Sequence, residues 1–460
     1  MIARAHVVVM VCAGLASCAP PPPPPAPRAP VDAVVVVEVP SLDEAAVLMK
    51  TAVQAGIAPA ALSGVSAAGL AAAGLRGPVV VAARPAGGVV VAAGVADRAR
   101  LELAIAAAAA ERGLPKTPLV GDTVAVGDTL VRAGDGAMFI IVGAVDALAE
   151  AALLEGLASG AVPTLPSLVD GPGVRVLVPA PRAPESGLAG AVRSALGALR
   201  GGLAVEGRTV TLTLSSTTAS AEVRAALAAP AAPGACALDD GAAVVVHVPP
   251  LTAPAALTAL SPDAADVAGQ LDAFGSRLAI AVRPQPSTVA VKDGDLASIA
   301  ALAIAGVPRP GARADLIASL EGAIGPTGVA AMQTKTVGER PVRHLPMPNR
   351  PWRDLSVIAE DDLFALGIGA AVPIDRLAVA APCPPSTSTA LIRLDGPKTA
   401  ALIERGRPDL AALRRAAALV GADDPLALLL AVERASIDAS AAATGLSLTT
   451  TVTLRAAVTP

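Results

Sequence analysis

Val35-Val36-Val37-Glu38-Val39-Pro40 returns in the second half of the chain as Val244-Val245-Val246-His247-Val248-Pro249. In each copy an apolar, β-branched run is interrupted by one polar residue and ended by proline, which predicts a largely buried strand. Ser41 and Glu44 follow the first copy at the spacing of a capping box, the pattern of a helix start. A strand that leads into a helical stretch, found twice, predicts an α+β fold with an internal repeat.

Three further matches follow in the same order: Val79–Pro85 with Leu278–Pro284, Ala133–Phe139 with Ala359–Ala365, and a closing hairpin within residues 203–215 with one within residues 435–455. The runs 77–84 and 88–93, and 129–133 and 137–142, are predicted hairpins, and strands that arrive in hairpins favour antiparallel sheets. The sequence therefore predicts two tandem similar α+β units, residues 31–230 and 234–459, each a mainly antiparallel sheet with helices packed on one face. A chance imitation of the repeat by the alanine-rich composition stays open.

The amino terminus has the features of an export signal, with Arg4 ahead of a short apolar run and small residues before Cys18. Leu15-Ala16-Ser17-Cys18 resembles the lipobox of bacterial lipoproteins. That resemblance implies cleavage between Ser17 and Cys18, a diacylated Cys18 thiol and an acyl chain, such as palmitate, on the new amino group. Residues 1–17 are then a signal peptide, and an ordinary secretory signal is the alternative.

Two features after the cysteine refine the expected location. Ala19 resembles the residue that lets lipoproteins of double-membraned bacteria pass to the outer membrane, so we expect a periplasmic or surface-exposed protein held there by lipid. The proline run of residues 20–25 lies in a linker, residues 18–30, which predicts a polyproline II spacer of roughly 35 Å. A proline-rich ligand for a groove-binding partner is the competing interpretation, with Arg28 as the one charge to orient it.

Composition limits the possible functions. The chain has no tyrosine, three phenylalanines and one tryptophan, and its net charge is −4, so it lacks the stacking residues and the basic surface of a nucleic-acid binder. The run Leu296–Pro308 is too short to span a bilayer and predicts a buried helix. In layout, the mature part also resembles exported bacterial proteins of a domain family without assigned function, a resemblance that carries no site residues.

Cys236 and Cys383 are the cysteines that remain once Cys12 leaves with the signal and Cys18 is acylated. Each lies seven residues before a predicted strand, residues 243–248 and 390–394, so adjacent strands could bring the two thiols together in an oxidising compartment. A disulfide and two free thiols are both open.

Reactive groups are scarce. After signal cleavage His247 and His344 are the histidines left, too few for a tetrahedral zinc site, and we predict no metal, no cofactor and no catalytic residues. Asp361 and Asp362 would suit acid–base work or a hard cation, although a turn between strands explains them without any chemistry. The basic segment from residue 335 to 353 predicts a contact patch or a solvated loop; its members are Arg340, Arg343, His344, Arg350, Trp352 and Arg353.

We therefore expect a membrane-anchored lipoprotein of the cell envelope, a non-enzymatic scaffold or interaction protein with an envelope protein as partner. Two alternatives remain. One is a carrier of an apolar ligand, such as lipid, in a crevice between sheet and helices, where small alanine and valine side chains leave space. The other is a hydrolase whose residues the sequence does not reveal.

Overall fold

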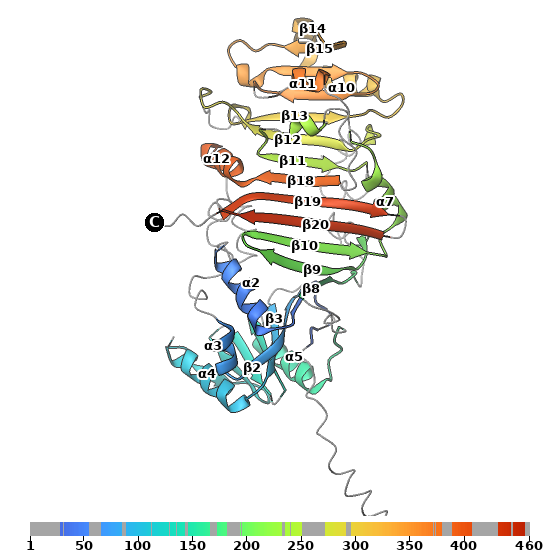
Figure 1. Ribbon diagram of the computed structural model, residues 1–460. Helices are drawn as coiled ribbons and strands as arrows, with labels where there is room; N and C mark the ends of the chain where they lie inside the picture. Colours follow the sequence, from blue (N-terminus) through green and yellow to red (C-terminus); the bar gives the residue numbers. More distant parts are fainter. Residues whose placement is uncertain are drawn as a thin grey trace, which may run out of the picture. The chain divides into compact units, whose positions relative to one another are not determined.

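Figure 1 shows the computed structural model. It describes residues 28–455, except 31, 55–65, 85–88, 112, 128, 135, 143–145, 166–172, 182–193, 195, 232–234, 240, 251–271, 291–295, 371, 373, 380–388, 407–430 and 443–444. Contacts divide the chain into a small body, Met1–Asp32 with Ala68–Ser167, and a large body, Ala33–Ala67 with Leu168–Pro460. The division of the sequence at residues 230–234 stays a prediction.

The small body is built on an antiparallel sheet. Its strand order is β2 (Leu75–Ala83), β3 (Val89–Val95), β7 (Ala137–Val142), β6 (Thr129–Ala133), β5 (Thr123–Val126) and β4 (Lys116–Pro118). The β2–β3 and β6–β7 hairpins confirm the predictions from local alternation and turn residues. The Gly134 amide donates to the Ala137 carbonyl at 3.1 Å, between the end of β6 and the start of β7.

Helices lie on both faces of this sheet. Besides α3 (Ala67–Ala72), they are α4 (Arg98–Glu111) and α5 (Ala147–Ser159). Leu101 of α4 packs in a core cluster with Val131 and Met138. By contrast, Glu155 of α5 bonds to Arg132. Since neighbouring residues of a strand point to opposite faces, Val131 and Arg132 place α4 and α5 on opposite sides.

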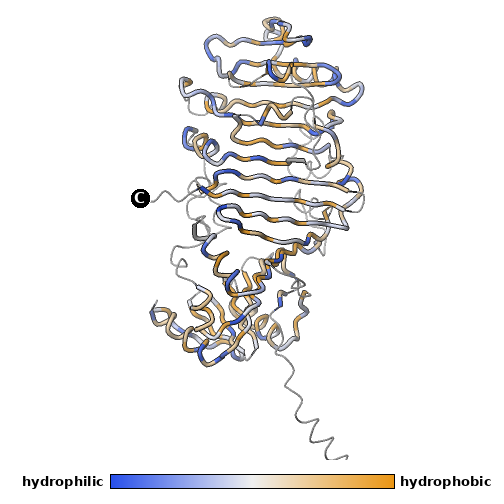
Figure 2. The backbone as a smooth tube through the Cα atoms, viewed as in Figure 1, coloured by the Kyte–Doolittle hydropathy of each residue, from blue (hydrophilic) through white to orange (hydrophobic). Residues whose placement is uncertain are grey.

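The large body contains one antiparallel sheet, much of which Figure 1 shows as a ladder of neighbouring strands. The strand order is β1 (Val35–Val39), β8 (Val174–Val178), β9 (Leu199–Glu206), β10 (Thr209–Ser216), β20 (Gly445–Leu454), β19 (Val432–Ala442), β18 (Thr389–Asp395), β11 (Val244–Val248), β12 (Leu278–Pro284), β13 (Ala300–Gly306), β17 (Phe364–Ile368), β16 (Leu355–Ala359), β15 (Arg340–Leu345) and β14 (Gln333–Val337). Apolar and polar residues alternate along many of these strands (Figure 2). The predicted α+β class with antiparallel pairing is confirmed.

Helical segments also cover both faces of the large sheet. On one side Ala281 and Ala303 pack with η2 (Ala235–Leu238) and α11 (Ile374–Val379). On the other, Ile280 and Ile304 pack with α10 (Arg313–Ala331), which is kinked at Gly325-Pro326. The prediction of helices on one face is therefore wrong for these strands, because alanine on one face and isoleucine on the other leave no polar side to solvate.

Further helices in the described part of the large body follow β1, β10 and β18 along the chain. After β1 comes α2 (Leu42–Gln54), where the Glu44 amide donates to Ser41 Oγ at 3.2 Å, which confirms the predicted helix start. Further along the chain are α7 (Ala221–Ala228) and α12 (Gly396–Gly406). Among the residues that the structure describes, no helix is both long and apolar enough to cross a bilayer.

The run Leu296–Pro308 corrects a second expectation. It forms a short 3-10 helix, η3 (Leu296–Ser298), and the strand β13, not a helix throughout. Ala301, Ala303 and Ala305 are fully buried within that strand. A short, wholly apolar run has no hydrophobic periodicity that distinguishes a buried strand from a buried helix. Here pairing with β12 and β17 determines that residues 300–306 form a strand.

Candidate functional site

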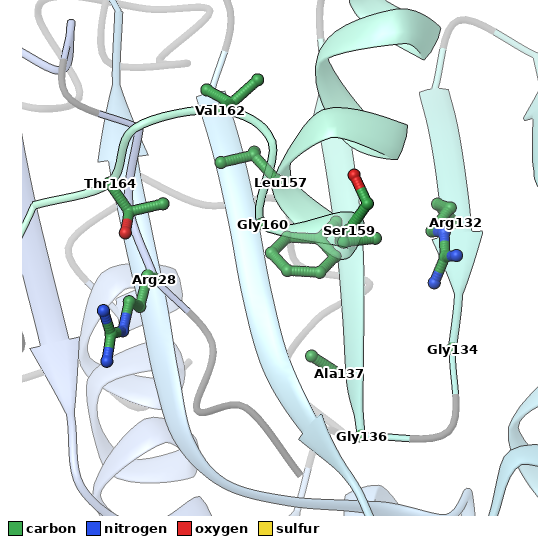
Figure 3. A pocket seen from close by; sticks show the side chains of 12 residues that line it. Arg28, Arg132, Gly134, Gly136, Ala137, Leu157, Ser159, Gly160, Val162 and Thr164 are labelled. Carbon is green, nitrogen blue, oxygen red and sulfur yellow. The ribbon is translucent and has the colours of Figure 1, made fainter.

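A cavity of about 500 Å³ lies in the small body between the β6–β7 hairpin and the end of α5 (Figure 3). The residues that line it are Arg28, Arg132, Gly134, Gly136, Ala137, Phe139, Leu157, Ala158, Ser159, Gly160, Val162 and Thr164. Figure 3 shows Arg28 and Thr164 on one side and Arg132 on the other, with Leu157 and Ala137 between them. The cavity is thus a crevice between sheet and helix with cationic groups at its sides.

The segment that carries Arg28 is fixed to the small body by several contacts. Pro30 forms an isolated antiparallel β-bridge with Thr164, and the Leu165 amide donates to the Ala29 carbonyl at 3.0 Å. Arg84 pairs with Asp32, Nε to Oδ2, at 3.2 Å and also with Glu150 of α5. These contacts position Arg28 beside the cavity.

Two glycines shape the opposite wall. Gly160 caps α5 with φ 75°, a left-handed conformation that L side chains rarely adopt, and a Cβ there would meet open space. Gly134 leaves room for Arg132, since a Cβ on Gly134 would lie 2.4 Å from Arg132 Nη1. Both positions favour glycine, one for its backbone and one for its size.

Arg132 is held in place by Glu155. Arg132 Nε lies 3.3 Å from Glu155 Oε2, and Glu155 also accepts from Thr123 Oγ1 at 2.8 Å. Partial burial acts to raise the pKa of the Glu155 carboxyl, but the Thr123 hydrogen bond and the Arg132 charge outweigh it, so this pKa lies below its usual value. The Glu155 carboxylate is thus the ion-pair partner of Arg132.

A second cavity, of about 540 Å³, lies in the large body and is more polar. Charged groups from β18, β19 and α12 line it: Arg393, Asp395, Lys398 and Arg434, with Asp239 from the turn after η2. Arg393 pairs with Asp239, and Lys398 Nζ lies 3.1 Å from Asp395 Oδ2. The carboxylates therefore offset two of its three cations.

His247 is close to Asp239, with its Nε2 4.0 Å from Asp239 Oδ1. Burial is the largest effect on its pKa and lowers it; Asp239 acts to raise the pKa, and Arg277 and Arg393 lower it further. His247 is 9% exposed and Glu38, at the matching position of the first copy, is 3% exposed. His247 is thus a buried strand residue whose neutral form is favoured.

The predicted contact patch has three members whose side chains bond within the large body. Arg340 pairs with Glu360 and Asp362, Arg343 Nη1 lies 3.0 Å from Glu321 Oε1, and His344 Nδ1 lies 3.0 Å from Ser356 Oγ.

The other three members lie around η4 (Pro351–Arg353). Trp352 is buried, so its ring is not part of the exposed surface, while Arg353 is half-buried and Arg350 is exposed. A contact function for the remaining basic groups stays a prediction.

Asp361 and Asp362 do not act as a pair in the structure. Asp361 is 86% exposed with Arg313 Nη1 at 3.7 Å, whereas Asp362 receives two hydrogen bonds from Arg340. The hydrogen bond from Arg340 lowers the pKa of Asp362 more than burial raises it. Within the described part of the chain, no three His, Cys, Asp or Glu residues gather as a metal site.

Of the cysteines predicted to pair or to carry lipid, the structure describes Cys236. Cys236, in η2, is disulfide-bonded. Cys383, Cys18 and Ser17 lie outside the described residues, so the Cys236–Cys383 pairing and the lipidation remain predictions.

The sequence pointed to Arg28 only as a charge beside the proline run, and it did not single out Arg132, Phe139 or Leu157. A local signal existed for Arg132, which is the one charged residue in the strands β6 and β7. The cavity itself depends on how α5 returns over the sheet, which no local pattern encodes.

The chain matches no known family model and no curated protein. Among solved structures, crystal forms IV and III of TP0453 are similar over 41% of this chain, at TM-scores of 0.27 and 0.28. Their sequences are 14% and 13% identical to it, and the similarity covers 81% and 77% of those chains. Similarity at such low TM-scores carries no argument about fold or function.

Proposed function

We propose that the protein is a lipid-anchored interaction protein of the cell envelope, tethered through Cys18 and acting by binding rather than by catalysis. The observation that carries the binding role is the two-faced surface of β9, β10, β20 and β19. On one face the strand register places hydroxyl residues opposite one another: Thr209 with Thr453, Thr211 with Thr451, Thr213 with Thr449 and Ser215 with Ser447. We call these eight residues the hydroxyl face.

The hydroxyl face suits a polar partner. Thr213 and Ser215 are exposed, and the other six are half-buried. On β19 the rows continue through Ser436 opposite Thr451 and Ser440 opposite Ser447. Each hydroxyl can both donate and accept a hydrogen bond, so the rows offer a broad surface that an envelope protein can bind.

The internal repeat belongs to the same proposal. In the small body the strand order begins with the β2–β3 hairpin and continues with a meander of β7, β6, β5 and β4. The large body has the same layout, with the β12–β13 hairpin followed by a meander of β17, β16, β15 and β14. The pairing order also matches between two sets of three consecutive strands, β8–β9–β10 and β18–β19–β20. These parallels support a duplicated unit of which residues 31–230 and 234–459 are the copies.

Photo-crosslinking in intact cells tests the binding role. The chain carries a photoreactive amino acid at Thr213 on the hydroxyl face or, as control, at Leu103, which is 71% exposed on α4 of the small body. We expect a discrete crosslinked species from position 213 that is missing from position 103 and disappears when Cys18→Ser removes the anchor. Identical products from both positions would contradict a partner at the hydroxyl face.

A second candidate, an apolar-ligand carrier, is favoured by the cavity of the small body. Its site is a crevice between sheet and helix, and Phe139, Leu157 and Ala137 form apolar walls. A volume near 500 Å³ falls within the range of small-molecule sites.

A further inference from the structure

We infer that the cavity of the small body binds an anionic amphiphile, with Arg28 holding its head group and the apolar walls holding its chain. The inference names the ligand class of the second candidate function and rests on it. A phospholipid of the adjacent membrane and a free fatty acid or alkyl phosphate share this chemistry.

The charge of the lining selects an anion. Two arginines and no carboxylate are present among the described residues that line the cavity, although Asp135, between Gly134 and Gly136 in the chain, lies outside them. Arg132 is already paired with Glu155. Arg28 is exposed and makes no ion pair within the described part of the chain, so its charge is available to a ligand.

The walls select a hydrocarbon chain. Phe139, Leu157 and Ala137 are each less than 8% exposed, and Val162 adds an aliphatic side chain at the rim. Burial of apolar surface stabilises a bound ligand, so a short alkyl chain along these walls adds affinity that an inorganic anion lacks. The lining is therefore amphipathic in the same sense as a lipid.

The end of α5 is compatible with an anion. A helix carboxyl end normally repels negative charge through its free carbonyl groups. Here the Glu155 carbonyl accepts from Ser159 Oγ, the Gly156 carbonyl accepts from the Val162 amide, and the Leu157 carbonyl accepts from the Gly160 amide. With these carbonyl groups already bonded, the repulsion is reduced and Arg28 dominates locally.

The position of Arg28 in the chain brings the cavity close to a source of ligand. Nine residues lie between Arg28 and Cys18, so the path from one to the other is at most about 36 Å when fully extended. If Cys18 is acylated, the cavity cannot move farther than this from the bilayer surface. Anionic lipid is then present at high local concentration.

Binding is measured on the full chain carrying Cys18→Ser, which removes the anchor and separates the test from the anchoring proposal. The probes are dodecyl phosphate below its micelle concentration, inorganic phosphate, and vesicles of phosphatidylcholine with or without phosphatidylglycerol. Arg28→Ala and Arg28→Glu are compared with Arg200→Ala, which removes an exposed cation on β9 of the large body and serves as the charge-matched control. Circular dichroism verifies that each variant is folded.

We expect saturable, one-to-one binding of dodecyl phosphate and binding of inorganic phosphate that is at least tenfold weaker. Arg28→Ala should weaken dodecyl phosphate binding by about tenfold or more, the usual effect of losing a charge-assisted hydrogen bond, and Arg28→Glu should abolish it. Added binding to phosphatidylglycerol vesicles identifies membrane lipid as the source, and binding of dodecyl phosphate alone identifies a free amphiphile. Equal affinity of Arg28→Ala, Arg200→Ala and the parent, or no binding of dodecyl phosphate, would overturn the inference.

Discussion

His247 and Arg340 represent opposite electrostatic situations. Burial lowers the pKa of His247, so the folded protein favours its neutral form. Arg340 is bonded to Asp362 and Glu360, which favour its charged form and raise its pKa. The sequence identified both residues but could not separate their roles, because partners such as Asp239 and Asp362 reach them through the tertiary fold.

The state of His247 predicts a pH dependence of stability. In the unfolded chain His247 titrates near 6.5, and in the folded protein its pKa is lower, so between these values the unfolded state binds more protons. The contribution of His247 to the free energy of unfolding should therefore be greatest above pH 6.5. It should decrease as the pH drops from 6.5 towards the pKa of His247 in the folded protein. Urea denaturation from pH 7 to pH 5 checks this, and His247→Gln should lose less stability over that range. Parallel curves for parent and variant would refute it.

Arg340 should contribute measurably to stability because its two hydrogen bonds to Asp362, at 2.7 and 2.6 Å, form a bidentate pair. We expect Arg340→Ala to lower the free energy of unfolding by about 1–2 kcal/mol. Arg313→Ala is the control, since Arg313 lies 3.7 Å from the largely exposed Asp361, and its effect should stay within about 0.5 kcal/mol. Chemical denaturation measures both variants, and equal losses of stability would contradict a stabilising role for the Arg340–Asp362 pair.

At the scale of elements, local patterns predicted what local forces determine. The β6–β7 and β9–β10 hairpins follow from alternating residues and turn glycines, and α2 follows from Ser41 and Glu44. The strand β13 was missed because an apolar run without period takes its structure from its neighbours.

The two faces of β10 give a prediction at the same scale. Leu214 lies opposite Leu448, which packs with Leu227 of α7, whereas Thr213 is exposed on the hydroxyl face. Leu214→Asp should lower the free energy of unfolding by about 2 kcal/mol, because it places a carboxylate against an apolar cluster. Thr213→Asp should change it by less than about 0.5 kcal/mol. Thermal or urea denaturation distinguishes these outcomes, and the reverse ranking would show that the faces are exchanged.

At the scale of the whole molecule, the pairing of β10 with β20 was beyond sequence reasoning. These strands are far apart in the chain, and no spacing or turn encodes a pairing of that range. The predicted division into two separate units does not imply that β10 and β20 pair with each other. In the structure, however, all of β10 is paired with β20.

That ladder can be tested by engineered disulfides. Thr211 and Thr451 are direct partners, so their Cα atoms fall in the range that a disulfide can bridge. Oxidation of Thr211→Cys/Thr451→Cys should yield a linked peptide pair. Thr211→Cys/Thr453→Cys, a diagonal pair on the same face, should not crosslink because its separation is about 7–8 Å. Efficient crosslinking of the diagonal pair alone would require a different register.

The proposed role depends on the attachment of the protein to a membrane through one residue. Mass spectrometry of the mature amino-terminal peptide from the native protein examines that attachment. We predict that the peptide begins at Cys18 and carries a diacylated thiol with a further acyl chain on its amino group. An unmodified amino terminus at any other residue would contradict the lipid anchor and, with it, the proposed place of this protein in the cell envelope.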